Sequence, residues 1–136
     1  MGKFEVKGIN HIGFVVKNAD ETLRVWEAIF GVERETFENK ELMARGGSLV
    51  LGGVRFTFNE STDPSSRWAK FLEDHGEGLE HIALTISDID DACESAKVVN
   101  VYPRLKEHKP YMGCLTNFFN RGDLHATALE LMEPQS

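Results

Sequence analysis

The sequence predicts an α+β fold made of two βαβββ units, and an internal repeat is the main observation behind this prediction. The segment that begins at Ile9 aligns with the segment that begins at Leu79, so that His11 and His81 fall at equivalent positions 70 residues apart. In both segments an apolar strand pattern leads through an acidic pair into a helical pattern. Because only two copies of this long period occur, the repeat indicates paired supersecondary units and not a solenoid.

The first predicted unit covers about residues 7–62 and begins with a strand and a helix. The strand is Ile9–Val16, and the helix covers about Ala19–Phe30 with Asn18 as its N-cap. Apolar residues of this helix recur three and four positions apart, as one buried face requires, and Gly31 ends the helix. Three extended segments complete the unit: Arg34–Phe37, Glu41–Ala44, and Ser48–Asn59 with a break at Gly52-Gly53.

The second predicted unit covers about residues 78–134 and repeats this order of elements. Its strand is His81–Ile86, and its helix is about Ile89–Val98 with Asp88 as the N-cap. A capped helix of about residues 65–75 links the two units, and we expect the whole chain, 1–136, to form a single domain. The remaining strands are predicted at Tyr102–Lys106, Gly113–Asn120 and Ala126–Met132.

Composition restricts the classes of partner. The formal net charge is −7 and no block of lysine and arginine occurs, which argues against nucleic acid. No apolar run approaches the roughly 20 residues of a membrane span, and the N-terminus lacks the apolar core of a signal peptide, so we expect a cytoplasmic protein without a membrane partner. Cys93 and Cys114 lack the spacing of a metal motif and are expected to be reduced.

Two histidines and one glutamate form a candidate metal site. Because strand side chains alternate between faces, His11 and His81 lie opposite the bulky residues of their strands, beside the small residues Gly13 and Ala83. A single strand histidine is more often an ordinary hydrogen-bonded residue, and the repeat is what favours a ligand here. Glu130 lies in the middle of the last predicted strand, where an unpaired carboxylate is costly. A divalent metal or a protonated histidine would pair it.

Three stretches resemble the vicinal oxygen chelate superfamily: NHIGFVVKNADETLRVWEAIFGV (Asn10–Val32), KFLEDHGEGLEHIALTISDID (Lys70–Asp90) and TALELMEP (Thr127–Pro134). Within it, the second stretch is most similar to methylmalonyl-CoA epimerases, which carry a similar FLE-x-x-GEGLHHIA run. The resemblance implies a cup-shaped mixed sheet of paired βαβββ units around a divalent metal ion, which is Co, Mn, Ni, Zn or Fe. Homodimers are common in such a family, so the resemblance also implies a dimer.

The resemblance implies metal ligands at His11, His81 and Glu130. The fourth ligand of the family, usually Glu or Gln, falls at Thr57, and the internal repeat also pairs Thr57 with Glu130. Threonine is a poor metal ligand, so this position departs from the family pattern. Other candidates for the fourth position are Asn59, Glu60, His125 and a water molecule. Glu80, which takes the place of a family histidine, is expected to point away from the metal.

As an epimerase-like protein, the chain is expected to invert a carbon next to a thioester through a metal-stabilised enolate. The resemblance implies carboxylate bases at Glu130 and, by a loose alignment, at Glu41, and a small-molecule substrate such as an acyl-CoA. Two alternatives on the same scaffold are a glyoxalase-type lyase and an Fe(II) extradiol-type dioxygenase, since two histidines and a glutamate form the facial triad of such oxygenases. A third alternative, which Thr57 keeps open, is a metal-free ligand-binding or resistance protein.

Overall fold

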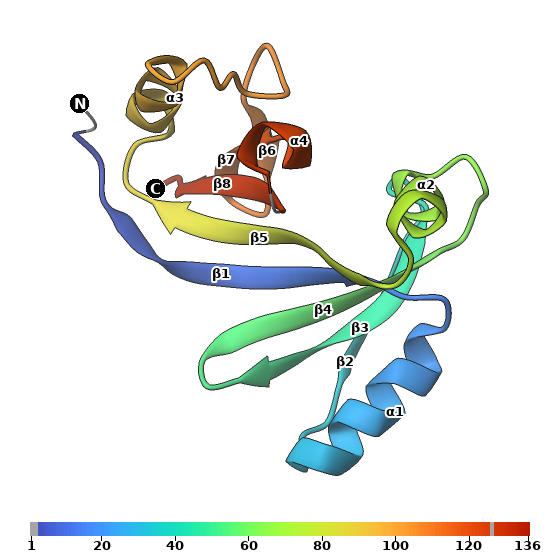
Figure 1. Ribbon diagram of the computed structural model, residues 1–136. Coiled ribbons are helices and arrows are strands. Elements are labelled where there is room, and N and C mark those ends of the chain that lie inside the picture. Colours follow the sequence, from blue (N-terminus) through green and yellow to red (C-terminus); the bar gives the residue numbers. More distant parts are fainter. Residues whose placement is uncertain (1–2, 126) are drawn as a thin grey trace. The chain divides into compact units, whose positions relative to one another are not determined.

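The structure, a computed structural model, describes residues 3–125 and 127–136 (Figure 1). Its contacts divide the chain into two compact units. We call His11–Glu80 the N-terminal unit, and His81–Ser136 with the residues up to Asn10 the C-terminal unit. Among the described residues, no helix has both the length and the apolar character that crossing a membrane requires.

The N-terminal unit contains a four-stranded sheet in the order β2-β3-β4-β1. Here β1 pairs with β4 in parallel, whereas β2, β3 and β4 follow one another antiparallel. Figure 1 shows α1 lying along β3 and β4. The elements are β1 (Val6–Val15), α1 (Ala19–Phe30), β2 (Glu35–Asn39), β3 (Ala44–Leu51), β4 (Val54–Ser61) and the linking helix α2 (Arg67–His75).

The C-terminal unit repeats this plan with the strand order β5-β8-β7-β6. Its β5 pairs with β8 in parallel, and β8, β7 and β6 are antiparallel neighbours. A short helix before β8 is an addition to the predicted elements. The elements are β5 (Gly78–Ile86), α3 (Ile89–Lys97), β6 (Lys109–Tyr111), β7 (Cys114–Phe119), α4 (Arg121–Leu124) and β8 (Ala128–Pro134). The predicted α+β class and the βαβββ order of both units are confirmed.

The predicted helix ends are also confirmed. The side chain of Asn18 accepts a hydrogen bond from the backbone N–H of Glu21, and Asp88 caps α3 in the same way. These side chains satisfy N–H groups that the first helical turn leaves without a partner. Gly31 ends α1 in the left-handed conformation with φ of 64°, and Gly76 follows the last residue of α2.

An aromatic cluster holds α1 against the N-terminal sheet. The ring of Phe14 lies 5.1 Å from that of Phe58 and 5.9 Å from that of Trp26, which also contacts Phe56. Such pairs contribute roughly 0.5–1.5 kcal/mol each beyond the burial of their area. The helix comes this close because β3 carries glycine at Gly47, where an added Cβ atom would lie 2.9 Å from Cδ1 of Leu23 in α1.

The core of the C-terminal unit lies between its sheet and α3. Ile86, Ile89 and Leu131 are buried there, and Leu84 packs against them. This confirms that the bulky face of the second repeated strand packs under its helix. Cys93 belongs to the same core, and burial raises the pKa of its thiol, so it stays protonated. Both cysteines are free, as predicted.

The predicted strand Glu41–Ala44 is wrong. Residues 40–43 form the turn between β2 and β3, with Met43 in the left-handed region at φ of 56°. A contact that is distant in sequence holds this turn, since the indole N–H of Trp68 donates to the carbonyl oxygen of Leu42 at 2.8 Å.

The predicted strand Tyr102–Lys106 is also wrong, because these residues lie in the loop before β6. Asn117 of β7 accepts a hydrogen bond from the N–H of Leu105 and donates one to its carbonyl oxygen. A side chain therefore satisfies the backbone groups that a ladder would otherwise use. The strand in this region is β6, and of the predicted last strand, Ala126 lies outside the described residues.

Candidate functional site

His81 and Glu130 lie together on one face of the C-terminal sheet. Nε2 of His81 is 3.4 Å from Oε1 of Glu130. Each residue is only 5% exposed, so neither group is solvated as it would be on the surface. A carboxylate removed from water to this degree requires a partner, and the imidazole is next to it.

The register of β5 and β8 explains this contact. His81 pairs with Ala128 and Ala83 with Glu130, so the histidine is the diagonal neighbour of the glutamate. Ala83 is fully buried and carries only a methyl group, which leaves room for the imidazole to approach the carboxylate. On β8, Leu131 points into the core under α3, so the faces predicted for this strand are confirmed.

The donor set and its spacing fit a divalent metal ion. Imidazole nitrogen and carboxylate oxygen are the ligand types that zinc and related metals accept. Two ligands at about 2.1 Å from one zinc ion and at the tetrahedral angle lie about 3.4 Å apart. The distance of 3.4 Å between His81 and Glu130 equals this separation, and it is long for a hydrogen bond between the same groups.

The N-terminal unit repeats the register but not the ligand. His11 pairs with Arg55 and Gly13 with Thr57 along β1 and β4. Thr57 therefore occupies in its unit the position that Glu130 occupies in the other, in agreement with the sequence repeat. His11 is half-buried on β1, at the position equivalent to that of His81.

Two alternatives for the missing fourth ligand have other roles within the N-terminal unit. Oε1 of Glu60 accepts a hydrogen bond from the N–H of Ala19 at 2.9 Å, and Oε2 pairs with Arg45 at 2.6 Å. Glu60 thus faces the first turn of α1, on the sheet face opposite to that of Thr57. Asn59 is buried and donates to the carbonyl oxygen of Phe14.

The remaining predicted residues lie in the turn between β2 and β3, on β5 and after α4; they are Glu41, Glu80 and His125. Glu41 is exposed in the turn between β2 and β3, so it does not lie on a strand as expected. Glu80 lies 3.5 Å from Arg67 of α2. His125 follows α4 in the left-handed conformation, with φ of 68°. Catalysis by Glu41 and ligation by His125 stay predictions.

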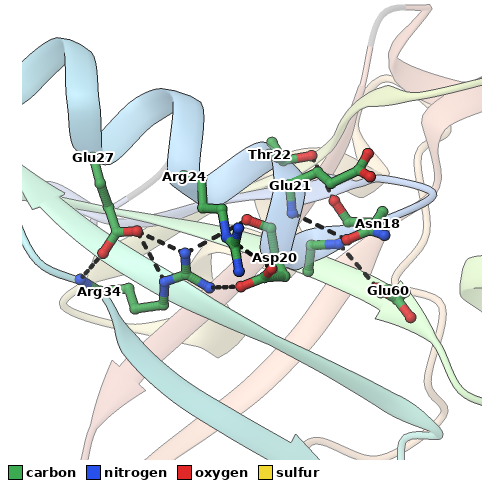
Figure 2. A network of polar contacts seen from close by, with 9 residues as sticks. Asn18, Asp20, Glu21, Thr22, Arg24, Glu27, Arg34 and Glu60 are labelled. Atoms are coloured by element: carbon green, nitrogen blue, oxygen red, sulfur yellow. Dashed lines mark hydrogen bonds and ion pairs between the residues drawn. The ribbon is translucent and has the colours of Figure 1, made fainter.

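A separate pocket of about 650 Å³ lies in the N-terminal unit between the first half of α1 and the strands β2 and β3. Figure 2 shows the polar network at its edge, in which Arg34 contacts Asp20 at 2.7 Å and Glu27 at 2.6 Å. The hydrogen bonds that Arg34 donates to Glu27 lower the pKa of Glu27, and this hydrogen bonding also raises the pKa of Arg34. Since these charges neutralise one another, we assign the network to the attachment of α1.

Sequence reasoning missed two residues that shape the C-terminal unit. Asn117 is fully buried and fixes the loop before β6, and Arg104 of that loop lies over the ring of Phe118. A polar residue in the middle of the predicted strand Gly113–Asn120 was the available signal for Asn117. The basic stretch Pro103–Pro110 was the available signal for Arg104, since it suggests contact with an anionic group, but it does not indicate the contact with Phe118.

A model of the Glyoxalase/Bleomycin resistance protein/Dioxygenase superfamily matches residues 10–105, which include both repeated strands. The chain belongs to this superfamily. The match agrees with the vicinal oxygen chelate resemblance of the sequence, and the paired βαβββ units are the fold of that superfamily.

Solved structures similar to this superfamily member include methylmalonyl-CoA epimerases. One from Mycobacterium tuberculosis has a TM-score of 0.82 at 23% identity and covers 100% of this chain and 93% of its own, which shows the shared fold. A second, in complex with methylmalonyl-CoA and NH4+, has a TM-score of 0.81 at 27% identity and covers 96% of each chain.

A curated relative has a different activity. The 4-hydroxyphenylpyruvate dioxygenase of Pseudomonas aeruginosa is 43% identical over 49 residues, which are 35% of this chain and 14% of the dioxygenase. The match therefore spans only a small part of that enzyme.

Proposed function

We propose that the protein is a metal-dependent isomerase that resembles methylmalonyl-CoA epimerase and inverts a carbon next to a thioester. The observation that carries the proposal is the buried pair of His81 and Glu130, whose ligand atoms lie 3.4 Å apart. Similarity over nearly the whole chain to an epimerase solved with methylmalonyl-CoA supports the reaction class and an acyl-CoA substrate.

The proposed metal ligands are His11, His81 and Glu130, each of which offers one ligand atom. The inclusion of His11 rests on its equivalence to His81 in the repeat and in the strand registers. Three protein ligands leave coordination positions for substrate oxygens, as a catalytic site requires. When bound, the divalent ion supplies a Lewis acid that polarises a carbonyl oxygen of the substrate.

The carboxylates are the proposed proton carriers. One removes the proton from the carbon between the two carbonyl groups, and the electron pair of the C–H bond passes to the thioester carbonyl. A second acid returns a proton to the opposite face of that carbon, which inverts it and restores the neutral thioester. We assign these roles to Glu130 and Glu41, and Glu130 would act as ligand and base together.

A second candidate is an Fe(II) dioxygenase, and one finding favours it. The curated relative is a 4-hydroxyphenylpyruvate dioxygenase, and two histidines with one carboxylate are the ligand set of many non-haem iron oxygenases. A glyoxalase-type lyase would use the same three ligands. A metal-free resistance protein would use none of them.

Metal content is the first test. Protein purified without chelators should contain about one divalent ion per chain by mass spectrometry of the elements, and His81→Ala should contain none. His75→Ala is the matched control, since His75 is the last residue of α2 and lies on neither of the repeated strands. A parent protein that takes up no metal from any supply contradicts all the metal-dependent proposals and leaves the metal-free binding protein.

Proton exchange then tests the reaction. The metal-loaded protein should exchange the α-proton of methylmalonyl-CoA with deuterium from D2O, and both Glu130→Gln and Glu41→Gln should exchange more slowly. Iron in the site, with oxygen consumption on 4-hydroxyphenylpyruvate and no exchange, would replace the isomerase by the dioxygenase. The proposal includes a cytoplasmic homodimer, and light scattering after size-exclusion chromatography measures the mass.

A further inference from the structure

The loop before β6 runs along the outer edge of β7 and is fixed there. The backbone N–H of Arg104 donates to the carbonyl oxygen of Phe118 at 2.7 Å, and the N–H of Leu105 donates to Oδ1 of the buried Asn117 at 3.0 Å. These contacts continue the line of β6, which pairs with the other half of the same edge. The backbone at Arg104 therefore has a defined place beside Phe118.

The side chain of Arg104 is also held. Its Cζ atom lies 4.8 Å from the centroid of the Phe118 ring, within the range of a cation–π contact. Its Nε–H donates to Oδ1 of Asn120 at 2.7 Å. A guanidinium presents five N–H donors in a planar fork, and the residue is exposed to solvent.

The ring under this guanidinium belongs to the face of the candidate site. Phe118 pairs directly with Glu130 across β7 and β8, and paired residues of antiparallel strands point to the same face, with Cβ atoms roughly 5 Å apart. His81 approaches Glu130 on that same face. Arg104 thus contacts the ring of the residue that pairs with the proposed ligand Glu130.

We infer that Arg104 binds an anionic group of the substrate, a carboxylate or a phosphate, beside the metal ligands His81 and Glu130. The inference rests on the proposed function, and it names the substrate class as one that carries a negative charge. A planar guanidinium matches both oxyanions with two parallel hydrogen bonds, which lysine cannot reproduce. The Phe118 ring and Asn120 fix the orientation of the fork before the ligand arrives, so less entropy is lost on binding.

The test measures binding and not turnover. Cobalt-loaded parent, Arg104→Gln and Lys106→Gln are titrated by calorimetry with methylmalonyl-CoA, propionyl-CoA and CoA. Lys106 is the matched control because it is exposed in the same loop and loses the same charge. Arg104→Gln should weaken the binding of methylmalonyl-CoA by about tenfold or more, as expected for a lost charge-assisted hydrogen bond. Lys106→Gln should weaken it by less than about twofold.

The three ligands identify the anion. If Arg104 binds the carboxylate, Arg104→Gln lowers the affinity for methylmalonyl-CoA alone, because propionyl-CoA and CoA lack that group. If Arg104 binds a phosphate, Arg104→Gln lowers the affinity for all three ligands. Arg104→Lys should recover part of the affinity in either case, since it restores the charge without the fork.

Equal affinities in Arg104→Gln and Lys106→Gln for all three ligands would overturn the inference. If the parent binds no acyl-CoA, malonate replaces it as the probe: weaker malonate binding in Arg104→Gln then keeps the inference and rejects the acyl-CoA substrate. A parent that binds neither malonate nor an acyl-CoA rejects the inference as well. If the parent binds these anions through Arg104 but does not exchange the α-proton, the proposed epimerase activity is rejected and the inference about Arg104 stands.

Discussion

Asn117 is completely buried, and its amide makes four hydrogen bonds within the C-terminal unit. Oδ1 accepts from the N–H groups of Leu105 and Phe118, and Nδ2 donates to the carbonyl oxygen of Leu105 and to Nδ1 of His108. This pattern fixes the orientation of the amide. Nδ1 of His108 must then be an acceptor, so its proton lies on Nε2, which faces Asp90 at 2.7 Å.

Replacing Asn117 should therefore be costly. Asn117→Ala leaves two N–H groups and one carbonyl without partners, and we expect it to lower the free energy of unfolding by about 2–4 kcal/mol. Urea denaturation measures the loss. Gln135→Ala, at an exposed residue near the C-terminus, should change it by less than about 0.5 kcal/mol. Equal stability of the two variants would contradict the assigned role of Asn117.

The ion pair of Glu27 and Arg34 gives stability a defined pH dependence. Hydrogen bonds from Arg34 hold the pKa of Glu27 below its ordinary value. The folded protein therefore binds this proton less readily than the unfolded chain does. The stabilisation is complete above the ordinary glutamate pKa of about 4.3, and it is lost as the pH falls through the lower folded value.

Glu27→Gln tests this assignment. The parent should be more stable than the variant at pH 6, and the difference should shrink as the pH is lowered below about 4.3. Chemical denaturation at a series of pH values measures it. In the Arg34→Gln variant, NMR titration should place the pKa of Glu27 higher than in the parent. A difference that grows on acidification would have the wrong sign for this ion pair.

At the scale of elements, the pairing of β3 with β4 depends on a glycine. Gly46→Ala should destabilise the N-terminal unit by about 1–3 kcal/mol or more, because the new methyl group overlaps the backbone of Phe58, which cannot rotate away. Gly122→Ala is the control, since nothing lies within 4 Å of an added Cβ atom there. The melting temperatures of the two variants provide the comparison.

The elements also show what a sequence can and cannot predict. The helices begin and end as predicted because Asn18, Asp88 and Gly31 act within a few residues of themselves. The strand predicted at Glu41–Ala44 failed because Trp68, far away in the chain, holds that turn. The contacts of the loop at Arg104 could not be predicted for the same kind of reason, since its partners Phe118 and Asn120 lie in β7 and directly after it.

At the scale of the whole molecule, metal binding should couple to folding. If the proposed site forms, saturation of the parent at about 100 times the dissociation constant adds about 2.7 kcal/mol to the free energy of unfolding. Glu130→Gln should abolish this gain. Without metal the same variant should lose little stability, because it replaces a buried charged carboxylate by a neutral amide of the same shape.

Thermal unfolding of the parent and of Glu130→Gln, each with and without cobalt, measures the stabilisation by metal in both proteins. Glu133→Gln is a suitable control because it lies on the same strand but accepts a hydrogen bond from the N–H of Ile89, outside the proposed site. A parent whose melting temperature does not respond to metal, or a Glu130→Gln variant that responds like the parent, would contradict the proposed ligands.

The sequence predicts the residues of the candidate site that lie on strands with a clear pattern, but not those that lie on loops. His81 follows from the equivalent segment 70 residues earlier and Glu130 from its place in the middle of the last predicted strand, and the structure places their ligand atoms 3.4 Å apart. Arg104 lies outside the two aligned segments, and only the tertiary structure places it over Phe118. The role of Glu41 stays a prediction. This residue lies in a turn where the sequence indicated a strand.

The matching registers of Thr57 and Glu130 bear on the ancestry of the chain. If one module was copied and joined to itself, both copies began with the same residue at this position. Each could then mutate independently, which two identical subunits of a half-length protein cannot do. Asymmetry between the halves is the freedom that a tandem duplication provides. Thr57→Glu would restore the symmetry, and the metal affinity of that variant would measure what the divergence changed.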